Sequence, residues 1–197
     1  MKKVRLAVVG AGMFGRKHIE TVRNEPIVDG AGFVRGLELK GHSVKGATVW
    51  LVGVGGGGGA IAVALAEAGV GKLFLTEQNA ERAKTVLQRL QRYYAGVAVE
   101  IVTAPPEAPH YAINATPCGL KPDDPMPFDP AALPASTLVC DIIMKPKETR
   151  LLQAAQGRGL RVQHGQHMMD AQVPMYLEFL GIPYGDERSI LEICARS

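Results

Sequence analysis

The sequence has few cysteines and no large excess of either charge sign. Three cysteines among 197 residues, at positions 118, 140 and 194, are too few and too widely spaced for a disulfide framework or a Cys-x-x-Cys metal site. The 22 basic and 19 acidic residues leave a net charge of +3, which is too balanced for the broad basic face of a nucleic-acid-binding protein. We therefore expect a protein of a reducing compartment, with no metal and no nucleic-acid partner.

A long hydrophobic run is also missing. Residues 49–66 carry no charge, but six of these 18 positions are glycine, which does not fit a membrane-spanning helix. Lys2 and Lys3 precede an apolar stretch as in a signal peptide, yet Arg16 and Lys17 follow where a cleavage site would lie. The sequence therefore favours a cytoplasmic protein without a membrane partner.

Glycine, in contrast, is abundant, at 23 of 197 residues or about 12%, against a usual ~7%. Short runs rich in Val, Ile and Leu alternate with longer segments of helical period, as in parallel sheets flanked by helices. This pattern predicts the α/β class, with a Rossmann-like, doubly wound and mostly parallel sheet in a single main domain. Strands are expected at Val4–Val9, Thr48–Val52, Lys72–Thr76, Val97–Val102, Tyr111–Asn114, Thr137–Ile142 and Arg161–Gln163. Helices are expected at Met13–Asn24, Gly32–Lys40, Gly58–Ala68, Ala80–Tyr94, Thr149–Gln156, Met168–Leu180 and Glu187–Ala195.

Residues 1–26 differ from the remainder in charge. They carry six basic and two acidic side chains, a net of +4, while the rest of the chain has a net of −1. We expect a strand-helix segment of different character (1–26), followed by a dinucleotide-binding domain (27–197). Such a segment could pack on the sheet edge or exchange between two copies, which leaves a homo-oligomer open.

Two glycine motifs, Gly10–Gly15 and Gly53–Gly58, each follow an expected strand and open an expected helix. In such a motif one glycine makes the tight turn, the next lets the backbone approach a pyrophosphate, and the third permits close helix–strand packing. The second motif is supported by Glu77, at the end of the next strand, whose carboxylate can accept hydrogen bonds from both ribose hydroxyls. The first motif has no such acidic partner and is interpreted as a packing turn, although a ligand there stays open.

Five segments between about Ile27 and Pro183 occur in an informative order. They are Asp29–Phe33, the glycine loop Gly53–Gly58, Asn114–Leu120, Asp141–Leu152 and Gly165–Gln172. In this order they resemble the carboxy-terminal nucleotide-binding half of the shikimate/quinate dehydrogenase family. Residues 1–26 instead resemble the start of the glucose-fructose oxidoreductase/inositol dehydrogenase family.

The resemblance implies which residues contact a nicotinamide cofactor. The pyrophosphate would lie on Gly53, Gly55, Gly56 and Gly58. The cofactor groove would be lined by Asn114, Thr116 and Pro117, and the nicotinamide would lie beside Ile142 and Gly165.

The same resemblance bears on the choice between NAD and NADP. Much of the family has an Asn-Arg-Thr triplet after the second strand, and its Arg pairs with the 2′-phosphate of NADP. Here the triplet is Glu77-Gln78-Asn79, which lacks the guanidinium and places a carboxylate where the phosphate would lie. NAD is therefore the expected cofactor, while Arg82, one turn further on, keeps NADP open.

On the substrate side, the resemblance implies hydride transfer between the nicotinamide and a secondary alcohol of a small hydroxylated carboxylate, such as shikimate or quinate. Asp29 matches the catalytic Asp that binds the reacting hydroxyl, and Gln172 matches a residue that hydrogen-bonds the substrate ring. The Lys that works with this Asp belongs to an N-terminal domain that residues 1–26 do not supply. Met144 and Ile27 stand where the family has a Tyr and an Asn.

Several of these residues have plainer explanations. Asp29 could only cap the helix that follows it, and Gln172 could be a solvated helix residue. His164 and His167 are three residues apart with no third ligand suitably spaced, and Cys118 has no base placed to activate it. Two functions therefore stay open: an oxidoreductase of the shikimate/quinate type, and a dinucleotide-binding module without turnover, acting as a sensor or a truncated remnant.

Overall fold

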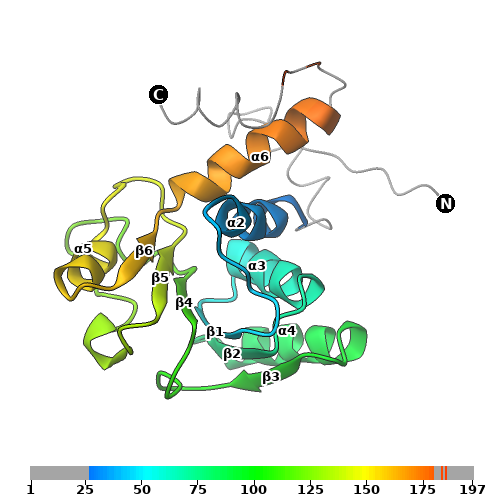
Figure 1. The fold of residues 1–197 in the computed structure, drawn as a ribbon. Coiled ribbons are helices and arrows are strands. Elements are labelled where there is room, and N and C mark those ends of the chain that lie inside the picture. Colours follow the sequence, from blue (N-terminus) through cyan, green and yellow to red (C-terminus); the bar gives the residue numbers. More distant parts are fainter. Residues whose placement is uncertain (1–26, 180–182, 184, 186–197) are drawn as a thin grey trace.

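The computed structural model describes residues 27–179, 183 and 185 of the chain. Six strands form one sheet in the order β3-β2-β1-β4-β5-β6, and every pair is parallel (Figure 1). The strands are β1 (Thr48–Val52), β2 (Lys72–Thr76), β3 (Ala98–Ile101), β4 (Tyr111–Asn114), β5 (Leu138–Asp141) and β6 (Arg161–Gln163). The expected α/β class and Rossmann-like parallel sheet are thus confirmed.

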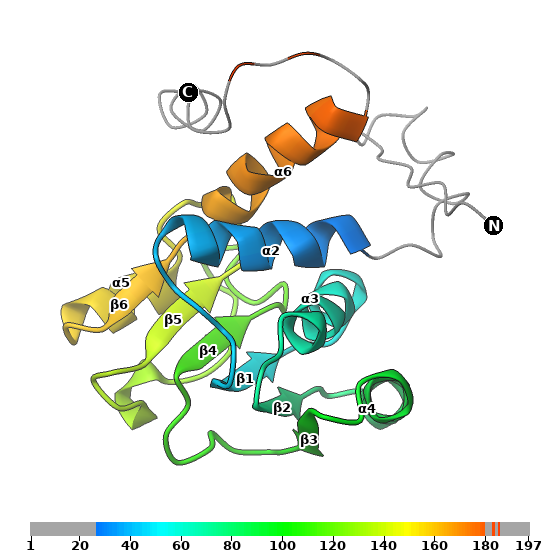
Figure 2. The ribbon, with the colours of Figure 1, turned by 45° about the vertical axis from the view of Figure 1, so that its right-hand side comes forward.

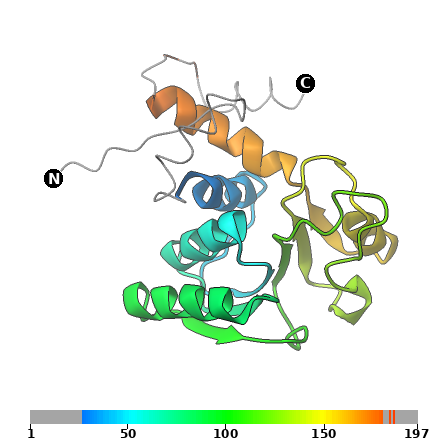
Figure 3. The same ribbon diagram turned by 180° about the vertical axis from the view of Figure 1, so that it is seen from behind.

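Alternate residues of β1 enter two separate cores, because successive side chains of a strand point to opposite faces of the sheet. Val49 and Leu51 join the core beneath α2 (Ile27–Leu39), α3 (Gly56–Glu67) and α4 (Ala80–Tyr93). Trp50 and Val52 join the core beneath α5 (Arg150–Gly157) and the short 3-10 helix η1 (Pro130–Ala132). Seen from behind, α3 and α4 lie apart from α5, with the sheet between them (Figure 3).

The helix α2 departs from the sequence prediction, which placed its start at Gly32. The described helix begins at Ile27 and contains three glycines. Although glycine disfavours a helix, a side chain at Gly30 would collide with the Ala60 carbonyl of α3, and one at Gly36 would collide with the His167 carbonyl. Close packing on two neighbouring helices therefore outweighs the low helix propensity.

The second of these neighbours, α6 (Gln166–Phe179), lies along the outer side of α2 (Figure 2). It begins two residues earlier than the predicted Met168 and includes Pro174. The bounds of β1, β2, β4 and β6 agree with the predicted strands, and α3 begins two residues before the predicted Gly58. The predicted elements at Val4–Val9, Met13–Asn24 and Glu187–Ala195, and the motif Gly10–Gly15, lie outside the described residues.

The described helices are all too short or too polar for a span of the lipid bilayer.

Candidate functional site

The glycine loop joins the end of β1 to the start of α3 at the carboxyl edge of the sheet. This is the point where the strand order reverses, since β2 lies on one side of β1 and β4 on the other. Open parallel sheets bind ligands in the crevice at such a switch point. The fold therefore places the second glycine motif where a dinucleotide site is expected.

The first and last glycines of this loop are required by the protein itself. Gly53 has φ +90°, and a Cβ there would lie 2.7 Å from Thr116 Cγ2 and 2.8 Å from the Ala115 carbonyl oxygen. A Cβ at Gly58 would collide with the Gly53 carbonyl, because the start of α3 packs directly on the turn. These two positions explain the tight turn and the close packing that the motif predicts.

Two of the three glycines between them, Gly55 and Gly56, are different, because no atom lies within 4 Å of the place where a Cβ would be. Neither has a positive φ, so the fold alone would accept a side chain at either position. Gly55 is the N-cap of α3 and gives no side-chain hydrogen bond to the helix. The first N–H groups of a helix have no partner within it and, with the helix dipole, attract anions. This bare backbone is the feature that a pyrophosphate needs.

Glu77 follows β2 and borders the loop. Its Oε2 accepts a hydrogen bond from the Val54 N–H at 3.0 Å, and its Oε1 accepts one from the Asn79 N–H at 2.9 Å. Arg82 Nη1 lies 3.4 Å from Oε1. Burial raises the pKa of this carboxyl, but the Asn79 and Val54 N–H groups and Arg82 outweigh it and hold the pKa below its ordinary value.

The Glu77 carboxylate therefore stays charged and supports the shape of the glycine loop, a role that sequence spacing did not reveal. Oε1 accepts hydrogen bonds from both the Asn79 N–H and Arg82, whereas Oε2 accepts only the Val54 N–H among the described residues and keeps a second lone-pair direction that a ribose hydroxyl could use. Gln78 is exposed beside it, and Asn79 caps α4 by accepting a hydrogen bond from the Arg82 N–H at 3.0 Å. The Arg82 side chain is 51% exposed.

Beyond β4 the site rests on a buried polar network. The Asn114 amide nitrogen donates to Asp141 Oδ1 at 3.1 Å, and its oxygen accepts from the hydroxyl and the N–H of Thr116 at 2.7 and 3.0 Å. Asp141 also accepts from the Ile143 N–H at 3.0 Å and from the Thr149 hydroxyl at 2.8 Å. Burial raises the pKa of Asp141, and the three hydrogen bonds oppose that rise.

This network changes what Asn114 can do, because its side chain is fully buried and its amide groups are used within the protein. Asn114 therefore shapes the segment that carries Thr116 and Pro117 rather than presenting its amide to a ligand. Asp141 and Thr149 were noticed in the sequence only as members of a motif, and nothing in their spacing predicted that they meet. Thr149 also caps α5 by accepting a hydrogen bond from the Leu152 N–H.

The remaining residues expected at the cofactor lie close to one another. Thr116 is partly exposed beside Gly53, and Pro117 is exposed next to it. The side chain of Ile142 approaches Gly57, since a Cβ at that glycine would lie 3.4 Å from Ile142 Cδ1. Gly165 packs against the backbone of Ile142, where a Cβ would lie 2.6 Å from the carbonyl oxygen. The structure thus gathers these residues around the glycine loop.

Asp29 and Gln172 are brought together across the contact of α2 with α6. Gln172 is only 2% exposed, so it is not the solvated helix residue that was one explanation of it. Asp29 lies inside α2, in the first turn of the described helix, and therefore does not cap a helix beginning near Gly32. Desolvation raises the pKa of the Asp29 carboxyl, and a hydrogen bond with Gln172 opposes the rise.

Two histidines, His164 and His167, lie near this end of the sheet and contact each other. His164 Nε2 lies 2.7 Å from Glu148 Oε1, and the rings of His164 and His167 meet edge to face at 5.8 Å. Burial first, then nearby Lys40 and His164, lower the pKa of His167 to about 4.

Within residues 27–179, no group of three His, Cys, Asp or Glu side chains could hold a metal ion. Cys118 lies in the loop held by Thr116, which accepts its N–H at 3.1 Å.

Comparisons with known proteins agree with this geometry. The chain is 34% identical over 150 residues to the shikimate dehydrogenase (NADP(+)) of Symbiobacterium thermophilum, matching 72% of this chain and 51% of that protein. It is also 34% identical over 145 residues to the enzyme of the same name from Rubrobacter xylanophilus, again 72% of this chain and 51% of the relative. The chain spans about half the length of these curated relatives. No model of a protein family matches the chain.

Solved structures give the same result. Quinate dehydrogenase from Corynebacterium glutamicum in complex with NAD has a TM-score of 0.73 and 30% identity, covering 84% of this chain and 60% of that one. Shikimate 5-dehydrogenase from Thermus thermophilus in complex with NADP(H) and shikimate has a TM-score of 0.68 and 26% identity, covering 86% and 62%.

Proposed function

Because the chain belongs to the shikimate and quinate dehydrogenase family, we propose that it is a nicotinamide-dependent oxidoreductase domain whose glycine loop binds NAD. One observation carries the proposal: the backbone at Gly55 and Gly56 is open, while the flanking Gly53 and Gly58 are held by the fold. A pyrophosphate needs bare N–H groups at the start of a helix, and these positions supply them.

The residues around the loop fit the rest of such a cofactor. Glu77, charged and adjacent to the loop, can accept a hydrogen bond from a ribose hydroxyl through the second lone pair of Oε2. Thr116, Pro117, Ile142 and Gly165 border the other side, so we assign them to the groove that leads to the nicotinamide. When bound, the nicotinamide would supply hydride transfer, which no side chain can carry out.

We propose NAD in preference to NADP because of the charge at Glu77. The lowered pKa keeps this carboxylate ionised, and it would repel a 2′-phosphate at the adjacent ribose. The curated relatives are named for NADP(+), and solved neighbours contain either NAD or NADP(H). Arg82 is half-exposed and already paired with Glu77, so it partly offsets the repulsion without removing it.

For the substrate we propose a small hydroxylated carboxylate, of which shikimate and quinate are the first to test. Asp29 would accept a hydrogen bond from the reacting hydroxyl, and the amide of Gln172 would orient both Asp29 and the substrate. Burial raises the pKa of the Asp29 carboxyl, which makes this group a better acceptor for the proton of the reacting hydroxyl. The apolar Ile27 and Met144, where the family has an Asn and a Tyr, favour the second candidate, a dinucleotide-binding module without turnover.

Two measurements test the proposal in order. Calorimetric titration with NAD and with NADP is expected to show saturable binding of NAD and weaker binding of NADP. Absorbance of the reduced nicotinamide, with shikimate or quinate added, then separates an enzyme from a module. An absence of NAD binding at millimolar concentration would contradict both functions. An active protein that keeps its rate after Asp29→Ala would contradict the role given to Asp29.

A further inference from the structure

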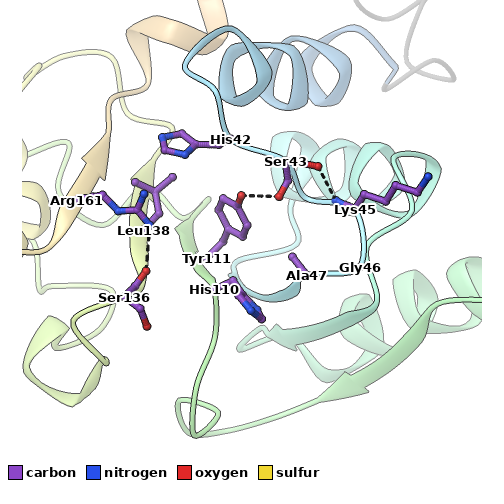
Figure 4. A pocket seen from close by; sticks show the side chains of 10 residues that line it. All are labelled: His42, Ser43, Lys45, Gly46, Ala47, His110, Tyr111, Ser136, Leu138 and Arg161. Atoms are coloured by element: carbon purple, nitrogen blue, oxygen red, sulfur yellow. Dashed lines mark hydrogen bonds between the residues drawn. The ribbon is translucent and has the colours of Figure 1, made fainter.

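A pocket of about 240 Å³ lies at the amino edge of the sheet, the edge opposite the glycine loop (Figure 4). Its wall comes from the connection between α2 and β1 and from the starts of β4, β5 and β6. The polar residues that line it are His42, Ser43, Lys45, His110, Ser136 and Arg161. None of the functional assignments above uses this pocket, which therefore needs its own explanation.

The charge of the lining has one sign. No Asp or Glu lines the pocket, and Arg161 forms no ion pair with any residue of the described ranges. Arg161 Nη2 donates to the Ser136 carbonyl at 3.2 Å, which fixes the guanidinium while leaving further N–H donors. His42 faces Arg161 across the pocket, and the Lys45 side chain points away from both (Figure 4).

The pKa of His42 reflects the positive charge of this pocket. Burial and the neighbouring positive charge of Arg161 both lower the pKa of His42. Burial is the larger of the two causes, and the contribution of Arg161 shows that its charge reaches His42. Of the charged side chains that line the pocket, Arg161 faces His42 and Lys45 points away from it, and none is an Asp or Glu.

The wall of the pocket is held in place by internal hydrogen bonds. The buried Tyr111 donates its hydroxyl proton to the Ser43 carbonyl at 2.7 Å, as drawn in Figure 4. The Thr48 N–H donates to His110 Nδ1 at 3.0 Å, so a neutral His110 carries its proton on Nε2 and can donate from there. A basic pocket with a fixed wall binds an anion without first ordering its own side chains.

We propose that this pocket is a binding site for a small oxyanion, a phosphate ion or the phosphate group of a small metabolite, held by Arg161 with His42 beside it. The planar guanidinium matches the geometry of phosphate oxygens. The volume is below the roughly 300–1,000 Å³ of pockets for larger ligands, so the occupant is small. The five residues of β1, about 17 Å, separate this site from the glycine loop.

Inorganic phosphate is the probe for the first experiment, added to the full chain at constant ionic strength because salt screens such contacts. Calorimetry is expected to show saturable binding that Arg161→Gln weakens at least ~10-fold, given the strength of hydrogen bonds to charged groups. The matched control is Arg158→Gln, because Arg158 also donates to a backbone carbonyl, that of Ala131, but does not line the pocket. Saturating NAD is expected to leave phosphate binding unchanged.

Three results would overturn the proposal: no saturable binding, equal binding by Arg161→Gln, or displacement of phosphate by NAD, which would place the ion on the glycine loop. If Arg161→Gln does not fold, His42→Gln replaces it. Proton NMR of the wild-type chain gives an independent readout, because a bound anion should raise the pKa of His42. A His42 titration unchanged at saturating phosphate would contradict the site.

Discussion

The carboxyl edge of the sheet is built in two different ways on its two sides. Where β1 ends, the surface is bare backbone, with an open stretch at Gly55 and Gly56 and one charged side chain, Glu77, supporting it. Where β4 and β5 end, the backbone is held from within by the buried side chains of Asn114 and Asp141.

The comparison separates a backbone that is open for contact with a ligand, at the end of β1, from a backbone that buried side chains support, at the ends of β4 and β5. A loop that must touch a ligand through its N–H groups cannot fill the same space with side chains, so its shape is fixed from the sides, by Glu77 and by close packing at Gly53 and Gly58. A loop that only lines the groove can be fixed by buried side chains, at the cost of placing polar groups in the core. Substitutions at the open positions of the first side should therefore affect binding, whereas substitutions at its packed glycines or in the buried network should also affect stability.

The largest effect is expected at Asp141. Asp141→Ala leaves the Thr149 hydroxyl, the Ile143 N–H and one bond of the Asn114 amide without their acceptor in the core, which should lower the free energy of unfolding by about 3–5 kcal/mol. Asp141→Asn keeps most of these bonds and should cost about 1 kcal/mol. Urea denaturation measures both, and equal stabilities of the two variants would contradict the network.

The next largest effect is expected at Gly58, in the glycine loop that follows β1. A Cβ at this position collides with the Gly53 carbonyl, so Gly58→Ala should lower the free energy of unfolding by about 2–3 kcal/mol and weaken NAD binding. Gly59→Ala is the matched control, because its Cβ would meet only the Val54 carbonyl oxygen at an ordinary 3.6 Å. Thermal unfolding is expected to separate the two variants, and identical melting temperatures would show that the tight approach at Gly58 is not required.

Away from both sides, the buried His167 at the start of α6 should make the stability of the fold depend on pH. Its pKa of about 4 in the fold lies below the ordinary 6.5, so the unfolded chain binds the proton more readily. This contribution to stability is present above pH 6.5 and is lost as the pH falls toward 4, by about 1–3 kcal/mol after allowance for partial exposure.

His167→Gln removes the titrating group and should flatten that part of the pH profile measured by urea denaturation. The surroundings include both signs of charge, since Lys40, Lys147 and His164 lower the pKa while Asp170 raises it. A wild-type profile that His167→Gln leaves unchanged between pH 4 and 6.5 would contradict the burial of a neutral imidazole.

The smallest of these effects is expected at Glu77. Glu77→Gln loses the charge but can still accept one of the two backbone N–H groups, so stability should fall by about 1 kcal/mol or less. NAD binding should weaken about 10-fold, since a hydrogen bond to a charged group is lost, and the preference for NAD over NADP should shrink. Calorimetric titration with both cofactors checks this, and an unchanged ratio of the two affinities would contradict the role of the carboxylate.

The sequence was sufficient for the sheet, because buried parallel strands are short runs of Val, Ile and Leu that stand out between glycines and prolines. It also predicted the tight turn at Gly53 and the close packing at Gly58, whereas the approach of a pyrophosphate to the backbone at Gly55 stays a prediction. The start of α2 was wrong, because its glycines serve close packing between helices, and no local propensity reveals a neighbouring helix.

Contacts between distant residues could not be predicted. Asn114 and Asp141 meet because the parallel strands β4 and β5 end at the same edge, and Thr149 reaches Asp141 from the start of α5. The hydrogen bonds of Glu77 to the Val54 and Asn79 N–H groups depend on backbone geometry. The basic pocket likewise gathers His42 and His110 from two connections, and Arg161 from the start of β6, which are far apart in the chain. Its lining has no local pattern in the sequence.

The most direct test of the dinucleotide site is NAD binding by Gly56→Val, measured by calorimetry beside the wild-type chain. The space around Gly56 accepts a side chain and its φ is not positive, so the variant should fold and melt close to the wild type. We predict that it loses NAD binding at least ~100-fold, because the new side chain occupies the place where the pyrophosphate meets the backbone. A folded Gly56→Val protein that binds NAD as tightly as the wild type would contradict the central claim.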